Sequence, residues 1–468
     1  MGLSNFGMRK TKTVCTIGPA SSSPETLRKM AEEGMDVARL NFSHADYASH
    51  LQRYERIRKI SVELGREIGI LQDLPGTKIR IGGFGGRSVW LKEGSEFVLR
   101  TRPCEGNERQ VYIDYPQLEN HVKPGDRVML DDGNLQLRVE GSLEGEIRCR
   151  VEIGGELKER KGAVFPDSDL PMPPITEGDI KALEFGARMG VDAVAVSFAR
   201  EAENILRVRE VLKKCGASHV QVVAKIEERR GVQNLKSILE VSDAIMVARG
   251  DLGVCMPREE VPLLQERIIK ACRKKGKPVI VATQMLESMV SNRTPTRAEV
   301  TDVAQAVLQG ADALMLSAET AVGKYPVEAV RELATVIDTV ERSEEFRKLL
   351  KSREYYPEIP TLQQSICMAM DIISESAQVR AIVVETDGRS AKLLSSYRPL
   401  LPIYAAVPDE TVARSLLLWW GVKPMVGTVQ EVIQKLKASG ILKERDKVLV
   451  SRHIVRTPFE AELKVVES

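Results

Sequence analysis

Charged side chains close two short apolar runs in the middle of the chain. Lys225 lies near the end of the run at 220–226, Glu227 directly follows that run, and Asp251 comes after the run at 244–247. Two carboxylates and an ammonium in one place can hold a hard cation and stabilise negative charge that develops in a transition state. An ion pair between Lys225 and Glu227 that serves only stability is the alternative. We interpret the combination as the mark of an enzyme.

Polar residues also follow the other apolar runs of this kind. At a single strand end a polar residue is ordinary, because strands simply end in polar residues. Polar residues at so many strand ends, several of them charged, instead predict a ring of polar groups around one mouth. The ring would consist of Arg39, Asn41, Ser43, Asp73, Ser197, Lys225, Glu227, Arg249, Asp251, Thr283, Ser317 and Glu319.

Eight short apolar runs supply the strands that such a mouth requires. Runs of this length bounded by polar or turn residues are typical of parallel strands buried on both faces. Segments with helical periodicity lie between most of them, at 25–33, 202–214, 261–274 and 297–308. This alternation predicts an α/β fold with a closed (β/α)8 TIM barrel, in which chemistry sits at the carboxyl ends of the strands. The predicted strands are 13–17, 36–40, 68–71, 191–196, 220–226, 244–247, 278–282 and 313–316.

The third unit of this pattern is interrupted by an insertion. A glycine-rich GGFGG segment at 82–86 lacks the spacing of a phosphate-binding loop, and we interpret it as a hinge. It is followed by strand-like segments at 88–91, 97–100, 110–113, 127–130, 135–139 and 146–152. We therefore expect the barrel to consist of residues 1–80 and 168–342. Residues 81–167, called the insert below, would form a small β-barrel lid domain over the mouth.

A second α/β pattern follows the barrel. Its strand-like segments lie at 381–384, 402–406, 424–426 and 447–450, with helical stretches between them. They predict a separate C-terminal domain at 343–468 with a mainly parallel sheet, which would serve regulation or assembly.

Composition excludes several classes of protein. The 68 basic and 66 acidic residues are interspersed and give a net charge of only +2, so no overall field favours nucleic acid or a membrane surface. The seven cysteines are scattered without a CxxC pair, as expected for reduced thiols in the cytoplasm. Because no long apolar run is present, we expect neither secretion nor membrane spanning. None of the five histidines shows HxxxH spacing, so we do not expect a zinc site.

Several long motifs, in the right order, resemble the signatures of the pyruvate kinase family. The resemblance extends through the barrel, the insert and the C-terminal domain. It implies transfer of a phosphoryl group from phosphoenolpyruvate to ADP, which gives pyruvate and ATP as the last step of glycolysis. The motifs are TIGPAS at 16–21, MDVARLNFSHAD at 35–46, KIEERRG at 225–231, MVARGDLG at 246–253, VATQMLESM at 281–289, TPTRAEVTDVA at 294–304 and SAETAVGKYP at 317–326.

This resemblance implies roles for the charged groups at the mouth. Glu227 and Asp251 would hold Mg²⁺, or Mn²⁺, with waters and substrate oxygens completing the shell. Lys225 would stabilise the transferring phosphoryl group and the enolate. Arg39 would hold the substrate phosphate as a fork.

The resemblance also assigns neutral groups. The backbone of Gly250 and the hydroxyl of Thr283 would meet the substrate carboxylate beside Asp251. Thr283 with Ser317 would route a proton, through water, to the enolate. A buried helix cap is the structural alternative for Thr283.

Two cations at the ends of the insert are assigned to the nucleotide. By resemblance Arg80 and Lys161 would face the phosphates of ADP, with Asn41 nearby, and closure of the insert would bring these cations onto the nucleotide and exclude water. Surface charge at a hinge is the alternative, and for Lys161 both interpretations stay open.

One departure from the family pattern concerns potassium. Potassium-dependent members carry Thr and Glu where this chain has Leu74 and Lys78. Asn41, Ser43 and Asp73 remain as a remnant of the monovalent-cation site. We expect the ammonium of Lys78 to replace the monovalent cation, so that activity does not require K⁺. A lysine that points to solvent is the alternative.

The C-terminal domain carries a candidate effector site. The stretch ETDGRSAKLLSSYRP at 385–399 reads as a strand, a polar turn and a helix, with Thr386, Arg389 and Ser390 as phosphate ligands by resemblance. An ordinary turn is the alternative. The tail at 452–463 lacks the glycine-rich loop of members that respond to fructose 1,6-bisphosphate. AMP, a sugar monophosphate or no effector remain as options, and the resemblance suggests a homotetramer.

Two other functions compete with this interpretation. A metal-dependent lyase that handles enolates on the same barrel would use similar strand-end residues, but it would not need Arg80 and Lys161 for a nucleotide. A catalytically silent metabolite-binding protein would have lost Lys225, Glu227 or Asp251, and all three are present.

Overall fold

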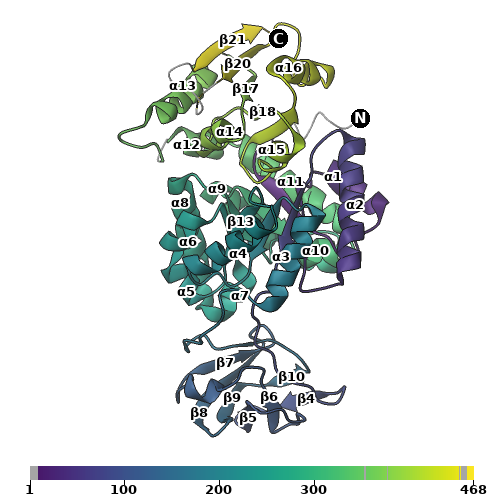
Figure 1. Cartoon of the computed structure of the whole chain (residues 1–468), viewed down its shortest axis with the longest axis vertical. Coiled ribbons are helices and arrows are strands. Elements are labelled where there is room, and N and C mark those ends of the chain that lie inside the picture. Colours follow the sequence, from purple (N-terminus) through teal and green to yellow (C-terminus); the bar gives the residue numbers. More distant parts are fainter. Residues whose placement is uncertain (1–8, 353–354, 377, 453, 455–460, 468) are drawn as a thin grey trace.

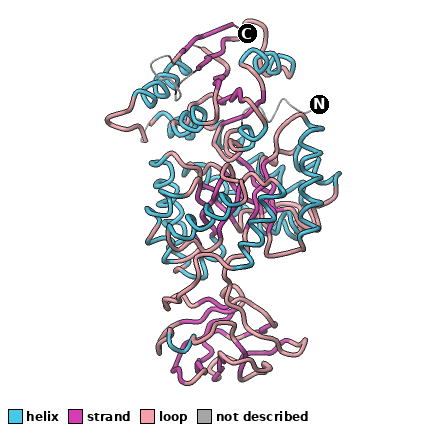
Figure 2. Tube along the Cα trace, viewed as in Figure 1, coloured by secondary structure: helices cyan, strands magenta, loops and turns pink. Residues whose placement is uncertain are grey.

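The computed structural model describes residues 9–352, 355–376, 378–452, 454 and 461–467. Figure 1 shows three tiers along the longest axis of the chain. A barrel of strands and helices occupies the middle, the insert lies at one end, and the C-terminal domain lies at the other. Figure 2 shows that strands line the centre of the middle tier and that helices surround them.

The middle tier is a closed barrel of eight strands that run parallel in chain order, as predicted. Each predicted apolar run became a strand. The strand predicted at 191–196 begins at Ala193 instead, because Asp192 belongs to the preceding turn. The Asp192 side chain accepts a hydrogen bond from the Ile70 amide at this end of the barrel. The strands are β1 (Lys12–Thr16), β2 (Val37–Asn41), β3 (Gly69–Asp73), β12 (Ala193–Val196), β13 (Gln221–Ile226), β14 (Ala244–Ala248), β15 (Val279–Ala282) and β16 (Ala313–Leu316).

Helices of the middle tier begin and end at residues suited to those positions. Thr176 and Thr296 form capping boxes, and Gly190 and Gly310 end their helices in the left-handed conformation. The helices are α1 (Pro24–Glu32), α2 (Tyr47–Leu64), α3 (Glu177–Met189), α4 (Ala202–Lys214), α5 (Arg229–Gln233), α6 (Leu235–Val241), α7 (Arg249–Cys255), α8 (Val261–Lys275), α9 (Arg297–Gln309), α10 (Ala318–Ala321) and α11 (Pro326–Arg342). Among the described residues no helix is both long and apolar enough to cross a membrane.

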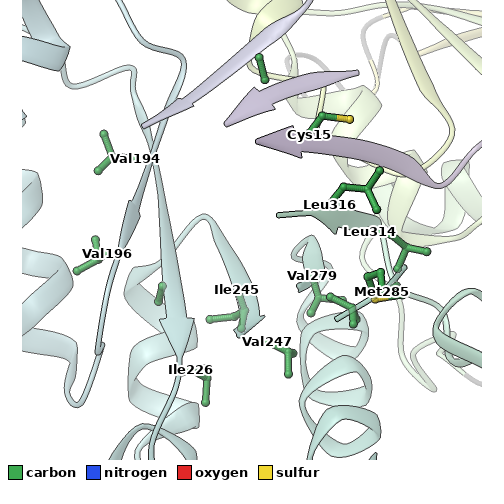
Figure 3. Close-up of a cluster of buried hydrophobic side chains, with 14 of the residues drawn as sticks. Cys15, Val194, Val196, Ile226, Ile245, Val247, Val279, Met285, Leu314 and Leu316 are labelled. Atoms are coloured by element: carbon green, nitrogen blue, oxygen red, sulfur yellow. The ribbon is translucent and has the colours of Figure 1, made fainter. Parts of the chain in front are cut away.

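Two apolar layers hold the barrel together, because successive side chains of a strand point to opposite faces. The outer layer packs between strands and helices, and Figure 3 shows part of it. Along β14, Ile245 and Val247 belong to this outer layer, whereas Ala244 and Met246 belong to the inner one. Both layers are mainly aliphatic, as expected for a chain with 4% aromatic residues.

The insert is a small all-β domain. Hydrogen bonds join six strands in the order β11-β7-β8-β9-β5-β6, and a separate pair is formed by β10 and β4. Isolated bridges from Ile81 to Ile113 and from Arg80 to Gly162 span the gap between β6 and β11, so the segment that enters the insert completes the barrel-like ring. The elements are β4 (Ser88–Leu91), β5 (Glu96–Arg100), β6 (Gln110–Tyr112), β7 (Arg127–Leu130), β8 (Leu135–Leu143), β9 (Glu146–Ile153), β10 (Gly155–Lys158) and β11 (Ala163–Val164).

The C-terminal domain has a five-stranded sheet in the order β19-β18-β17-β20-β21. Four strands are parallel, as predicted, but the edge strand β21 (Glu462–Glu467) is antiparallel and does not follow from the sequence pattern. The parallel strands are β17 (Ala381–Glu385), β18 (Ile403–Val407), β19 (Val422–Val426) and β20 (Lys447–Arg452). The helices are α12 (Glu344–Lys351), α13 (Leu362–Ser376), α14 (Arg389–Ser396), α15 (Glu410–Arg414) and α16 (Val429–Ala438).

A turn of the C-terminal domain closes the floor of the barrel. Leu417 and Leu418 are buried in the inner apolar layer together with Val37 and Leu71. Gly69 at the start of β3 leaves room for Leu417, because a Cβ there would lie 3.3 Å from its Cδ1. The C-terminal domain is therefore packed against the end of the barrel opposite the polar mouth.

Candidate active site

A layer of polar side chains stands directly above the inner apolar layer. Alternation along a strand places residue i+2 on the same face as residue i, one step nearer the carboxyl end. Each polar residue of this layer follows an inner apolar residue by two positions. The pairs are Val14 with Thr16, Val37 with Arg39, Leu71 with Asp73, Ala195 with Ser197 and Val223 with Lys225.

Lys225 lies at the centre of this layer and is buried. Its Nζ donates to Ser197 Oγ at 2.7 Å and forms ion pairs with Glu227 at 3.0 Å and Asp73 at 3.1 Å. Burial alone would lower the pKa of Lys225, but the two carboxylates hold it above its ordinary value. The ammonium thus stays charged at the base of the mouth. The ion pair between Lys225 and Glu227 that the sequence suggested is present, alongside the contact with Asp73.

Asp73 connects Lys225 to Arg39. Its Oδ2 accepts from Arg39 Nε at 2.7 Å, while Arg39 also donates to Thr16 Oγ1 at 2.9 Å. Burial opposes ionisation, yet Lys225 and Arg39 lower the pKa of this carboxyl below its ordinary value. The sequence assigns Asp73 only to a monovalent-cation remnant. In the structure it fixes both cations that are expected to handle phosphate.

Glu227 and Asp251 lie close enough to influence each other electrostatically. Burial raises the pKa of Glu227, and the negative charge of Asp251 raises it further against the lowering by Lys225. Oε2 of Glu227 accepts from the Phe198 amide at 2.5 Å, which fixes the carboxylate. Two acids from neighbouring strands suit a hard divalent cation that keeps waters and substrate oxygens as its remaining ligands. No larger group of ligating side chains is found among the described residues.

Lys78 contacts one of the two predicted metal ligands. Its Nζ forms an ion pair with Asp251 Oδ1 at 3.0 Å and lies 5.7 Å from the centre of the Phe198 ring. Asp73, another member of the monovalent-cation remnant, is paired with Arg39 and Lys225. Asn41 Oδ1 accepts from the Ser43 amide at 3.1 Å, so these two residues form a local turn.

Thr283 and Gly250 are hydrogen-bonded to each other. The Gly250 amide donates to Thr283 Oγ1 at 2.7 Å, and this hydroxyl donates to the Ala282 carbonyl at 2.5 Å. Thr283 has a φ of 71°, a left-handed conformation that is rare for a β-branched residue. Strain of this kind collects at functional sites.

Ser317 presents a buried hydroxyl beside a buried acid. Its Oγ has no hydrogen-bond partner among the described residues. Its amide donates to Glu319 Oε2 at 2.7 Å, and Oε1 of the same carboxylate accepts from the Leu286 amide at 3.0 Å. Glu319 therefore fixes the loops after β15 and β16. A buried hydroxyl without a partner suggests that water or a ligand completes this position.

Arg80 and Lys161 lie side by side where the chain enters and leaves the insert. Arg80 donates to the Arg160 carbonyl at 3.0 Å, and Lys161 pairs with Asp131 at 2.7 Å. Both side chains are solvent-accessible. These contacts of Arg80 and Lys161 are with residues of the insert, and not with Glu227 or Asp251.

The candidate effector residues form an ordinary local turn. Thr386 Oγ1 accepts from the Gly388 amide at 2.9 Å, Arg389 pairs with Asp387 at 2.7 Å, and Ser390 is buried in the first turn of α14. Most of the tail at 452–463 lies outside the described residues, since 453 and 455–460 are not among them.

Two supporting groups do not stand out in the sequence. Thr16 holds Arg39, and the backbone of Phe198, at a left-handed φ of 53°, holds Glu227. The signal for Thr16 is its spacing, because it follows an inner apolar residue by two positions as Arg39 and Lys225 do. Backbone donors such as the Phe198 amide leave no signal in side-chain types.

Family models match most of the chain. The model described as the pyruvate kinase barrel domain matches residues 8–330, and the model described as the pyruvate kinase alpha/beta domain matches residues 364–458.

Individual relatives agree with these matches. A pyruvate kinase of Geobacillus stearothermophilus is 42% identical over 454 residues, which cover 95% of this chain and 77% of the relative. Pyruvate kinase 2 of a Synechocystis species is 41% identical over 456 residues, which cover 95% of this chain and 76% of the relative. The crystal structure of a pyruvate kinase from Cryptosporidium parvum has a TM-score of 0.93 at 32% identity, and the match covers 100% of this chain and 98% of that one.

Proposed function

Because this chain belongs to the pyruvate kinase family, we propose that it transfers the phosphoryl group of phosphoenolpyruvate to ADP through the site around Lys225. The products would be pyruvate and ATP, as in the last step of glycolysis. The observation that carries this proposal is the position of Lys225, whose ammonium lies 3.0 Å from Glu227 and 3.1 Å from Asp73 inside the mouth.

Glu227 and Asp251 would hold Mg²⁺ or Mn²⁺ on the rim of the mouth. When bound, the ion supplies positive charge against the oxygens of the phosphoryl group and the enolate. The residues around it position the reactants. Such a transfer depends on positioning and charge neutralisation rather than on covalent chemistry of the protein.

Lys225 and Arg39 would balance the charge that moves. The ammonium of Lys225 is fixed by three neighbours and so needs no reorganisation when negative charge appears on the transferred group or on the enolate oxygen. Arg39 uses Nε on Asp73 and one terminal nitrogen on Thr16. A guanidinium has five N–H donors, so others can face the substrate phosphate.

Thr283, Gly250 and Ser317 would act at the carboxylate and at the carbon that takes up a proton. Pyruvate forms when the methylene carbon of the enolate gains a proton from water. Thr283 Oγ1 is fixed by Gly250, and the Ser317 hydroxyl is buried without a partner among the described residues. Both groups can therefore orient that water.

The insert would deliver the nucleotide-binding cations. Arg80 and Lys161 stand at its two connections to the barrel, and a rotation there would carry them toward ADP, with Asn41 on the barrel side. The ion pair of Lys161 with Asp131 would have to break before Lys161 could contact the phosphates.

Potassium independence is part of the proposal, and Lys78 forms an ion pair with Asp251. Leu74 is buried and offers no side-chain oxygen as a ligand, and Lys78 places a positive charge at the same mouth. A monovalent cation would thus find fewer ligands and more positive charge than in members with Thr and Glu at these positions.

Regulation and assembly are proposed on the family resemblance. A phosphorylated effector such as AMP or a sugar monophosphate, rather than fructose 1,6-bisphosphate, would bind at Thr386, Arg389 and Ser390. Titration of each compound against the phosphoenolpyruvate saturation curve tests this, and an unchanged curve contradicts it. We expect a homotetramer that acts in the cytoplasm, and light scattering of the purified chain measures the subunit number.

A coupled assay for pyruvate tests the main proposal. Pyruvate should form from phosphoenolpyruvate only when ADP and Mg²⁺ are both present, with one ATP for each pyruvate. Pyruvate released without consumption of ADP would instead support the lyase, and binding without turnover would support the silent metabolite-binding protein.

A further inference from the structure

The turn after β15 is strained at two successive residues. Thr283 and Gln284 have φ values of 71° and 55°, both in the left-handed region that is costly for residues other than glycine. Such a conformation costs on the order of 1–3 kcal/mol for each residue and persists only when neighbours fix it. A group that fixes this turn would therefore control where the Thr283 hydroxyl points.

Arg249 is the neighbour that fixes this turn. Its terminal nitrogen donates to the Thr283 carbonyl at 2.7 Å, and its Nε donates to the same oxygen at 3.3 Å. The following residue, Gly250, donates its amide to Thr283 Oγ1 at 2.7 Å. Arg249 and Gly250, which are adjacent in sequence, thus donate hydrogen bonds to both the carbonyl and the hydroxyl of Thr283.

Two residues of neighbouring helices hold the Arg249 guanidinium on the side away from Thr283. Its other terminal nitrogen donates to Asp302 Oδ1 in α9 at 2.8 Å and to Gln265 Oε1 in α8 at 3.4 Å. Only 11% of the Arg249 side chain is exposed. Because the guanidinium is planar and presents its donors as a rigid fork, it can span Asp302 and Thr283 in one fixed geometry, which a lysine cannot do.

We propose that Arg249, held by Asp302, is a positioning residue that keeps the Thr283 hydroxyl aligned for protonation of the enolate carbon. This inference rests on the proposed function, because the part of Thr283 in the proton step is itself proposed there. Arg249 acts through Thr283 rather than on the substrate. Its loss should therefore impair the proton step more than phosphoenolpyruvate binding.

Exchange of the pyruvate methyl hydrogens isolates that step. In D₂O with Mg²⁺ and inorganic phosphate, a methyl C–H bond breaks, the proton passes to solvent, and a C–D bond forms when the enolate is protonated again. Proton NMR follows the exchange without ADP turnover. We expect Arg249→Lys and Asp302→Asn to slow it at least tenfold, while the Kd for phosphoenolpyruvate changes less than threefold.

A control variant, a chemical rescue and a Thr283 variant show whether a loss of exchange is due to the positioning of Thr283. Arg331→Lys removes a similar fork from an exposed pair with Glu33 and should leave exchange unchanged. Guanidinium added to Arg249→Ala should restore part of the exchange. Unaltered exchange in Arg249→Lys, or an equal loss of exchange and of phosphoenolpyruvate binding, overturns the inference. Thr283→Val distinguishes failure of the proposed role of Thr283 from failure of the positioning role of Arg249. If this variant leaves exchange intact, the proposed role of Thr283 in the proton step is wrong.

Discussion

The Nζ of Lys78 lies 3.0 Å from Oδ1 of Asp251, across 173 positions of sequence. Glu227 has an ammonium of its own at the same distance, that of Lys225. The two pairs differ in burial, since 10% of the Lys225 side chain and 37% of the Lys78 side chain are exposed. Lys225 is therefore a fixed part of the site, whereas Lys78 stands at its edge on a flexible stem, where a metal ion would compete with it.

Removal of this competitor should tighten metal binding. We expect Lys78→Met to lower the Kd for Mn²⁺ in the absence of substrates by up to about fivefold, because a partly exposed ion pair contributes about 1 kcal/mol at most. Isothermal titration calorimetry measures the change. Lys59→Met, an exposed lysine of α2, serves as the control. A weaker or unchanged affinity in Lys78→Met would show that the ammonium does not oppose the metal.

Potassium should have little effect on turnover. Leu74 supplies no hydroxyl ligand and Lys78 adds positive charge to the mouth, so a monovalent cation gains little there. The assay runs in buffer free of sodium and potassium, with tetramethylammonium to keep ionic strength constant. A tenfold or greater activation by K⁺ would defeat the expectation.

Lys225→Met should abolish turnover and spare substrate binding. A preorganised charge aimed at the transition state is worth about a hundredfold or more in kcat. Phosphoenolpyruvate should still bind, because Arg39 stays fixed by Asp73 and Thr16. Steady-state kinetics and equilibrium binding give the two values. Near-wild-type turnover in this variant would refute the charge-stabilising role.

Asp36 should stabilise the barrel in a pH-dependent way. Burial raises the pKa of its carboxyl, but Arg9, Lys12, Arg66 and the Thr13 amide together hold it below its ordinary value. Its contribution is therefore complete above the unfolded pKa of about 3.9 and is lost as pH falls through the lower folded value.

We expect Asp36→Asn to lower stability by about 3 kcal/mol, because it leaves buried cations without their partner. Calorimetry should find the same Tm difference from wild type between pH 5 and 8, and a smaller one below about pH 4. A difference that already closes between pH 7 and 5 would contradict the lowered pKa.

The floor of the barrel should depend on the C-terminal turn. Leu418→Ala removes a buried side chain from the inner apolar layer and should cost about 2–5 kcal/mol. Val62→Ala on α2, where the side chain is 82% exposed, should stay within about 0.5 kcal/mol of wild type. Equal melting temperatures for the two variants would show that the turn adds nothing to the barrel.

The sequence by itself determined the order and type of the elements. Buried parallel strands have to be apolar on both faces, so the eight runs are visible as continuous hydrophobic segments. The alternation of side chains along a strand is enough to predict that Lys225 and Glu227 lie on the same side of the chain. The antiparallel edge strand β21 is not visible in this way, because charged residues such as Glu462 and Lys464 interrupt its apolar pattern.

Only the tertiary structure decided which charges meet. The stem of a lysine is long enough to reach several acids, and the acid that Lys78 contacts is Asp251, 173 positions away in sequence. Asp73 became the link between Arg39 and Lys225 because β2 is the neighbour of β3 on one side, and β13 lies beyond β12 on the other side. Leu417 entered the barrel floor because a separate domain docked there. The alternation of side chains along a strand determines the face on which a side chain lies. The residue that it contacts depends on the register of strands that are far apart in the chain and on how they close into a barrel.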